Sequence, residues 1–131
     1  MEITEILKAC RLNSGASEEA IHDAELALGY SLPSDYVKFL RAQNGVEGFV
    51  GNNYLIIWRV EELSPFNAEY EAAKYVPGLV LFASSGGGAG YGFDTREVSM
   101  PVVSVEFIGM DWSEADRVAG NFTEFLNSLA G

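Results

Sequence analysis

The sequence predicts an α+β fold, in which helices pack about a mainly antiparallel sheet. Three observations predict it. Amphipathic helical patterns fill the first third of the chain, short strand-like runs separated by turns follow, and one more amphipathic helix closes it. With 131 residues, 48% of them hydrophobic, the chain has the size of one domain and enough apolar surface for a core. We therefore expect a single domain over residues 1–131.

The N-terminal pattern predicts a short helix over residues 2–12. Its apolar side chains fall on one stripe: Ile3, Ile6, Leu7 and Cys10. Cys10 is the one cysteine of the chain, so no intramolecular disulfide is possible. Its place on the stripe predicts a small buried hydrophobe and not a reactive thiol.

Two longer helices are predicted next. Ser17 has the residue type of an N-cap before the second helix, and Gly29 ends that helix. The polar face of the second helix carries four acidic residues and no basic one, with Leu26 in their midst. Pro33 suits the first turn of a third helix, which ends at residues 44–45.

The middle of the chain is predicted to alternate between strands and turns. Residues 45–53 are rich in glycine and asparagine and are predicted to form a loop, whereas the residue types at 54–58 are typical of a strand. A helix is predicted over 65–75. The apolar run 79–83 predicts a strand buried on both faces, and residues 91–94 should return as the second arm of a hairpin.

The C-terminal third is predicted to add a strand over 101–108, in which apolar and polar residues alternate, and a final helix. Asn121 and Glu124 have the spacing of a capping box at the start of that helix. We expect its apolar stripe to pack on the sheet: Phe122, Phe125, Leu126 and Leu129.

The glycine-rich stretch 84–92 lacks the residues of a nucleotide-binding loop. Such a loop needs a lysine and a hydroxyl after its last glycine, at the start of a helix. Here strand-like residues follow the glycines. We interpret the stretch as a hairpin turn that needs positive φ angles, and its bare backbone would let another chain approach closely.

Few residues suggest catalysis or metal binding. The chain has one histidine, His22, and one cysteine, which are fewer than a zinc site needs. The carboxylates show no calcium-loop spacing, and no set of nucleophile, base and orienting group is evident. We therefore expect no metal, no cofactor and no enzymatic activity, with a hydrolase that uses two carboxylates as the open alternative.

The charge balance favours a basic protein partner. With 8 basic and 19 acidic residues, the formal net charge is -11. This charge repels nucleic acid and anionic membranes and attracts cationic surfaces, although it would also serve solubility alone. The N-terminus lacks the basic and apolar regions of a signal peptide, and no apolar run is long enough to cross a bilayer. Together with the absence of disulfides, these features predict a cytoplasmic location.

An ordered set of motifs resembles the SUKH superfamily, which contains the fungal Smi/Knr cell-wall-assembly regulators. The head of the pattern is Ile21, Glu25, Leu28-Gly29, Leu32-Pro33, Asp35-Tyr36, Phe39-Leu40 and Asn44-Gly45. Ile57-Trp58, the glycine hairpin after Phe82, and Phe125-Leu126 continue it, so that the resemblance spans roughly residues 17–129. The asparagine-rich stretch 51–53 and the run 109–112 have no counterpart in the pattern.

The resemblance implies a sheet with helices packed about it, no catalysis, no cofactor and a protein partner. Many bacterial members are similar to immunity proteins, which bind and neutralise a cognate toxin, and others are regulatory. The leading hypothesis is therefore an immunity-type protein that blocks a basic toxin domain. The alternative is a cytosolic regulator or adaptor of the Smi/Knr type with an endogenous partner.

The resemblance assigns no binding residue, because the shared positions are mostly core. Loops and strand ends usually carry recognition, so we expect acidic residues there to contact the partner. These candidates are Glu61, Glu62, Asp94, Glu97, Glu106 and Asp111. The alternative is that each is a solvated surface charge. The oligomeric state is left open.

Overall fold

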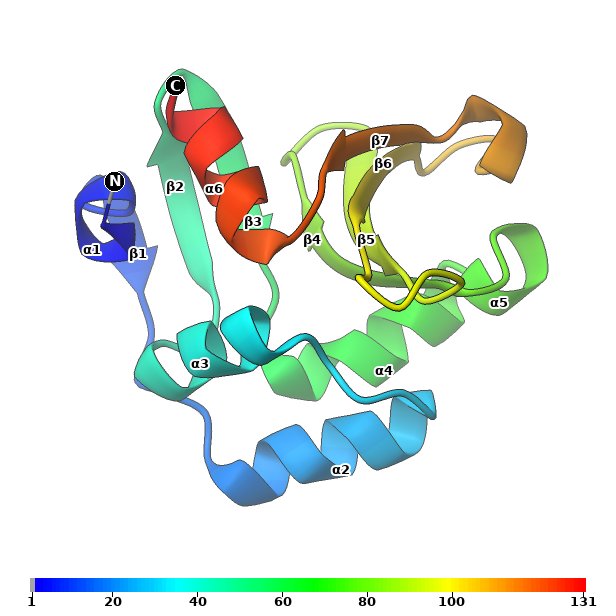
Figure 1. The fold of residues 1–131 in the computed structure, drawn as a ribbon, viewed down its shortest axis with the longest axis horizontal. Coiled ribbons are helices and arrows are strands. Elements are labelled where there is room, and N and C mark those ends of the chain that lie inside the picture. The colour runs from blue at the N-terminus through cyan, green and yellow to red at the C-terminus, as the bar shows by residue number, and fades with distance from the viewer. Residues whose placement is uncertain (1) are drawn as a thin grey trace.

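Within residues 2–131, which the structure describes, seven strands form one antiparallel sheet. Each strand pairs with the strands that precede and follow it in the chain, as the computed structural model shows in Figure 1. Helices from the first half of the chain and from the C-terminus pack against this sheet. The predicted α+β fold is confirmed, and the sheet is antiparallel throughout.

The helices and strands have the following bounds. The α-helices are α1 (Ile3–Ile6), α2 (Glu18–Leu28), α3 (Ser34–Ala42), α4 (Val60–Glu69), α5 (Ala72–Tyr75) and α6 (Phe122–Ala130). The strands are β1 (Cys10–Leu12), β2 (Val46–Val50), β3 (Asn53–Ile57), β4 (Leu79–Ser84), β5 (Ala89–Asp94), β6 (Val102–Glu106) and β7 (Asp116–Ala119). A 3-10 helix, η1 (Trp112–Glu114), precedes β7.

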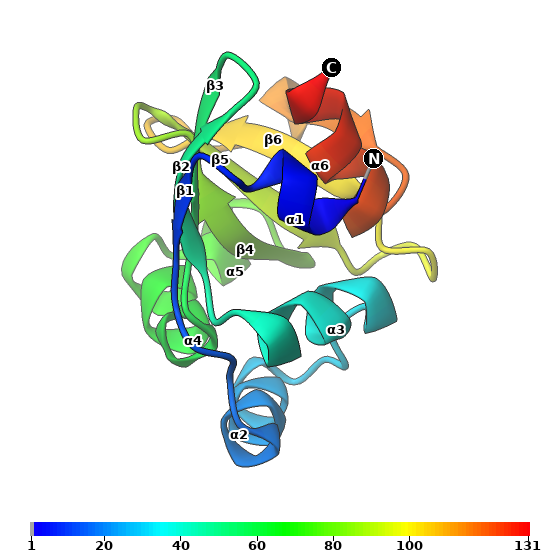
Figure 2. The same cartoon turned by 90° about the vertical axis from the view of Figure 1, so that its left-hand side faces the viewer.

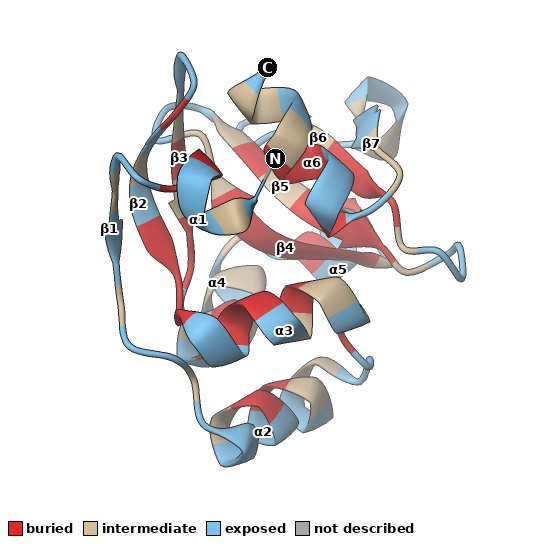
Figure 3. Cartoon of the chain, turned by 60° about the vertical axis from the view of Figure 1, so that its left-hand side comes forward, coloured by how far each residue is buried: buried red, intermediate tan, exposed pale blue. Residues whose placement is uncertain are grey.

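An aromatic cluster joins α3 and α6 to the middle of the sheet. The ring of Tyr36 lies 5.4 Å from Phe82, 5.0 Å from Phe93 and 5.2 Å from Phe122, measured between ring centroids. Phe125 meets Phe82 edge-on. Figure 3 shows the buried residues gathered where α3, α6 and β4 face one another. The predicted apolar stripe of α6 is confirmed, since its aromatic residues and Leu126 are buried and Leu129 is partly buried.

The N-terminal segment differs from its prediction. The first helix ends at Ile6, and Cys10 begins β1, the edge strand that pairs with β2. The predicted helix to residue 12 was wrong because so short a helix is marginal, whereas the edge of β2 offers backbone hydrogen bonds. Cys10 is half-buried on this strand, and its Sγ donates to the Phe49 carbonyl at 3.5 Å.

Residues 45–53 form most of a hairpin, so the predicted loop was wrong. β2 and β3 pair along their full length around a turn at Gly51. Gly48, at φ 152, faces Cys10 in the neighbouring strand, and a Cβ there would lie 2.7 Å from the Cys10 Cα. The glycines that suggested a loop therefore permit the close approach of β1 and a tight turn.

α4 begins at Val60, five residues before the predicted start, and takes Pro65 into its interior. Glu71, with φ 56, ends the helical path, so the predicted helix over 65–75 is divided between α4 and α5. α4 also supplies hydrogen bonds to the backbone of β4 beyond the end of its pairing with β3. The side-chain amide of Asn67 donates to the Leu81 carbonyl and accepts from the Leu81 amide, each at 2.9 Å.

Candidate partner-binding surface

Asp94 is buried, and its carboxylate is bonded to Arg96 within the fold. It is 4% exposed, and its carboxylate accepts from the Arg96 backbone and guanidinium at 2.9 to 3.1 Å. Burial alone would raise the pKa of Asp94, but the hydrogen bonds and charge of Arg96 outweigh it and lower that pKa. The sequence does not show that this carboxylate is already bonded within the fold, and a contact of Asp94 with a partner stays a prediction.

Arg96 also joins Asp94 to the run 109–112, which the sequence left unassigned. The guanidinium carbon of Arg96 lies 3.4 Å from the ring centroid of Trp112. The indole Nε1 of Trp112 donates to the Pro77 carbonyl at 2.9 Å. This stack anchors the segment between β6 and β7 to the turn before β4.

Glu61 and Glu62 lie in the first turn of α4 and not in a loop after a strand. Glu62 accepts from the Arg59 amide at 2.9 Å. Glu61 accepts from the Asn44 side chain at 2.7 Å, and Asn44 in turn accepts from the Val60 amide at 2.8 Å. These carboxylates satisfy or organise the free donors at the helix start, where negative charge is also favoured by the helix dipole.

Glu97 and Asp111 are exposed, and each has a partner within the chain. Glu97 accepts from Arg117 at 3.4 Å, which links the β5–β6 turn to β7. Asp111 accepts from the Ser113 amide at 2.8 Å and begins η1. The hydrogen bonds from Ser113 lower the pKa of Asp111. Both carboxylates still face solvent.

Glu106 is the exception among the six predicted residues. Its side chain is exposed and, within residues 2–131, makes no ion pair or hydrogen bond. It ends β6 beside the glycine turn, where the Phe107 amide donates to the Gly88 carbonyl at 2.8 Å. The structure does not bring the six residues into one site, and Glu106 is the one among them whose charge is unused by the described fold.

The acidic face of α2 is partly neutralised from α3. Arg41 on α3 donates to both carboxylate oxygens of Glu18, so a basic residue from another helix opposes a face that carries none of its own. Glu25 accepts from the Leu32 amide at 2.7 Å. Leu26 is 68% exposed, as its place among the acidic residues predicted.

A second surface, the hairpin surface formed by Glu47, Phe49 and Tyr54, was missed because residues 45–53, which include Glu47 and Phe49, were predicted to form a loop. Phe49 is 54% exposed, and its ring meets that of Tyr54 edge-on at 5.1 Å between centroids. The Tyr54 hydroxyl donates to Glu47 at 2.5 Å, and this bond raises the pKa of Tyr54. The alternation of Val46 and Val50 with Glu47 and Phe49 was the available signal.

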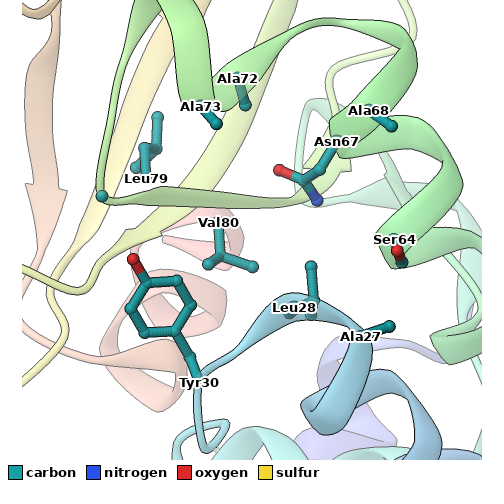
Figure 4. Close-up of a pocket in the computed structure, with 11 residues that line it drawn as sticks. Ala27, Leu28, Tyr30, Ser64, Asn67, Ala68, Ala72, Ala73, Leu79 and Val80 are labelled. Carbon is teal, nitrogen blue, oxygen red and sulfur yellow. The ribbon is translucent and has the colours of Figure 1, made fainter.

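An apolar cavity of about 230 Å³ lies between α2, the α4–α5 segment and β4 (Figure 4). Small and aliphatic side chains dominate its lining: Ala27, Leu28, Ala68, Ala72, Ala73, Leu79 and Val80. Asn67 points toward it, but its amide is committed to the backbone of Leu63 and Leu81. Ser64 and Tyr30 add hydroxyl groups, and the lining holds no carboxylate, imidazole or thiol, so the cavity suits an uncharged group.

Two further properties concern residues 2–131 as described. No three side chains among His, Cys, Asp and Glu are grouped so that they could hold a metal ion. No helix in this part of the chain has the length and apolar character needed to span a membrane. His22 is exposed on α2.

Comparison with known proteins identifies the family. The model of the SMI1 / KNR4 family (SUKH-1) matches residues 15–128. No curated protein matches the chain. The matched segment contains α2 to α5, β2 to β7 and most of α6, including both stretches that the resemblance left without a counterpart. The resemblance to the SUKH superfamily is thereby confirmed, and the chain belongs to the SMI1 / KNR4 family (SUKH-1).

Proposed function

We propose that this chain is a non-catalytic protein-binding module, and that it acts in the cytoplasm as an immunity-type protein that occludes a basic toxin domain. Family membership supports a binding role. The observation that carries the proposal is the large number of acidic side chains that form no ion pair within residues 2–131. The chain has 19 acidic and 8 basic residues, but the side chains of residues 2–131 form three ion pairs.

The unused charge suits capture of a cationic protein. Exposed carboxylates distributed over several elements make the electrostatic potential around the molecule more negative and increase the encounter rate with a basic partner. Exposed carboxylates of this kind are Glu106 on β6 and both Glu19 and Asp23 on α2. A nuclease-like toxin would present the positive surface that such a field attracts.

A regulatory adaptor of the Smi/Knr type is the second candidate. The cavity of Figure 4 favours it, since an uncharged, largely aliphatic lining would accept an apolar side chain from a partner of any net charge. An adaptor would then depend on this cavity, whereas charge capture would not.

Co-expression with the product of a neighbouring toxin-like gene tests the immunity proposal. Growth should be restored, and calorimetry with the purified pair should give an affinity that falls as salt rises. Val80→Trp, which fills the cavity, should leave rescue intact. Absence of both binding and rescue would contradict the immunity proposal and favour the adaptor. Rescue that Val80→Trp abolishes would contradict capture by charge alone.

A further inference from the structure

We infer that the hairpin surface of Glu47, Phe49 and Tyr54 binds an arginine side chain presented by a basic protein partner. This inference rests on the proposed function and names the contact through which a basic partner is recognised. It follows from the register of one hairpin, the exposure of its aromatic pair and the chemistry of one carboxylate.

The register places the three side chains on one face of the sheet. Phe49 pairs with Tyr54 and Glu47 pairs with Ile56, so these side chains point the same way. Val50 and Leu55 point to the opposite face and are buried. Figure 2 shows α1 and α6 on one side of the hairpin and the β4–β5 turn on the other, where no helix covers it.

The aromatic pair packs against the glycine turn through Tyr54 and is exposed at Phe49. A Cβ on Gly86 would lie 2.7 Å from the Tyr54 ring, so the glycine turn packs directly against that ring. Phe49 meets Tyr54 edge-on and is 54% exposed. An aromatic side chain has only two rotatable side-chain bonds, so it loses little conformational entropy when a partner covers it.

The carboxylate beside the rings selects a planar cation. Tyr54 donates to one oxygen of Glu47, and the other oxygen has no hydrogen-bond donor within residues 2–131. A guanidinium stacked on Phe49 can donate to that oxygen while it keeps its aromatic contact.

Arginine fits this surface better than lysine. Arg11 stands opposite Glu47 across the β1–β2 pairing, so the local charge is partly balanced. A preference for arginine over lysine must then come from stacking and directed hydrogen bonds. The planar guanidinium supplies both, and the ammonium of lysine does not. A second copy of this chain is a poorer occupant, because each copy carries a net charge of -11.

The test uses the full chain with hexa-arginine and hexa-lysine peptides at low salt. In amide NMR spectra, hexa-arginine should shift the resonances of β2, β3 and the glycine turn at 86–88, and it should bind more tightly than hexa-lysine. Phe49→Ala should weaken hexa-arginine binding about two- to five-fold, and Phe49→Tyr should retain it. Glu47→Gln should reduce the preference for arginine.

Leu26→Ala is the matched control, because Leu26 is an exposed apolar residue among carboxylates on α2. It should leave binding unchanged. If hexa-arginine binds but shifts α2, and Leu26→Ala weakens it while Phe49→Ala does not, the inference is overturned and the proposed function stands. If neither peptide binds, the basic partner of the proposed function is contradicted as well. A dimer abolished by Phe49→Ala would show that the surface serves self-association, which also overturns the inference.

Discussion

The hydroxyl of Tyr36 is buried without a hydrogen-bond partner among the described residues. Its ring is surrounded by phenylalanines, and burial raises the pKa of the phenol well above its ordinary value. A buried, unbonded hydroxyl costs free energy that a phenylalanine would not. The position therefore carries a polar atom that the folded core does not use.

Tyr36→Phe should raise the free energy of unfolding by about 1 kcal/mol, since the substitution removes the unsatisfied hydroxyl and keeps the ring packing. Urea unfolding monitored by circular dichroism measures this change. Tyr54→Phe is the control, because the Tyr54 hydroxyl is bonded to Glu47, and it should give no stabilisation. A loss of stability in Tyr36→Phe would mean that the hydroxyl has a partner in solution.

The bond between Asp94 and Arg96 should make the free energy of unfolding decrease as the pH falls into the acid range. Because the folded-state pKa of Asp94 lies below its ordinary value, the stabilisation is present above about pH 4 and is lost as pH falls through that lower pKa. Asp94→Asn should lower the free energy of unfolding by about 1.5–3 kcal/mol at pH 7 and weaken this acid dependence.

Glu97→Gln is the matched control for that variant. Glu97 and Arg117 are both about half-exposed, so losing this pair should change stability by less than about 1 kcal/mol. Equal effects of the two substitutions in urea unfolding at pH 7 would contradict the distinction between the buried and the exposed carboxylate.

At the scale of elements, sequence patterns succeeded where the signal is local. Ser17 and Asn121 do accept the backbone hydrogen bonds that their types as N-caps predicted, and the buried run became β4. β1 and β7 were missed because short edge strands with exposed residues exist through pairing with distant partners. The predicted strand at 54–58 is β3, but β2 was missed because glycine occurs both in loops and in strands that another backbone approaches closely.

Gly48→Ala should detach β1 from the sheet. The φ of 152 is unfavourable for alanine, and the added Cβ would collide with the Cys10 backbone. We expect a loss of about 1–3 kcal/mol and faster hydrogen exchange of the β1 amides. Gly87→Ala, in the exposed turn with 3.7 Å to the nearest atom, should be neutral. Unchanged exchange in Gly48→Ala would show that β1 tolerates the contact.

At the scale of the whole molecule, the composition predicts a negative electrostatic field. It does not predict which carboxylates are free to interact with a partner. Asp94 and Glu106 are both carboxylates at strand ends, yet one is bonded inside the fold and the other is free within the described chain. Hydrogen bonding between distant segments decides this difference, and one sequence does not display it. The net charge could be predicted from the sequence, whereas the carboxylates that remain unbonded in the fold could not.

Glu106→Lys should slow association with a basic partner without altering stability, because this carboxylate makes no ion pair or hydrogen bond within residues 2–131. Glu62→Lys reverses the same charge but removes the bond to the Arg59 amide at the start of α4, so it should also lower stability by about 1 kcal/mol. Stopped-flow association rates and thermal unfolding separate the two effects. Equal association rates for Glu106→Lys and the parent chain would argue against charge steering through this edge.

The stack of Arg96 on Trp112 gives the molecule an intrinsic optical reporter. Trp58 is buried against Phe66, whereas the indole of Trp112 lies under a guanidinium that Asp94 holds in place. In a Trp58→Phe chain, the tryptophan emission would come from Trp112 alone. Acidification that protonates Asp94 would release the guanidinium and alter the emission of Trp112 before the far-ultraviolet circular dichroism changes. Fluorescence would thereby follow the loosening of one loop separately from the unfolding of the sheet.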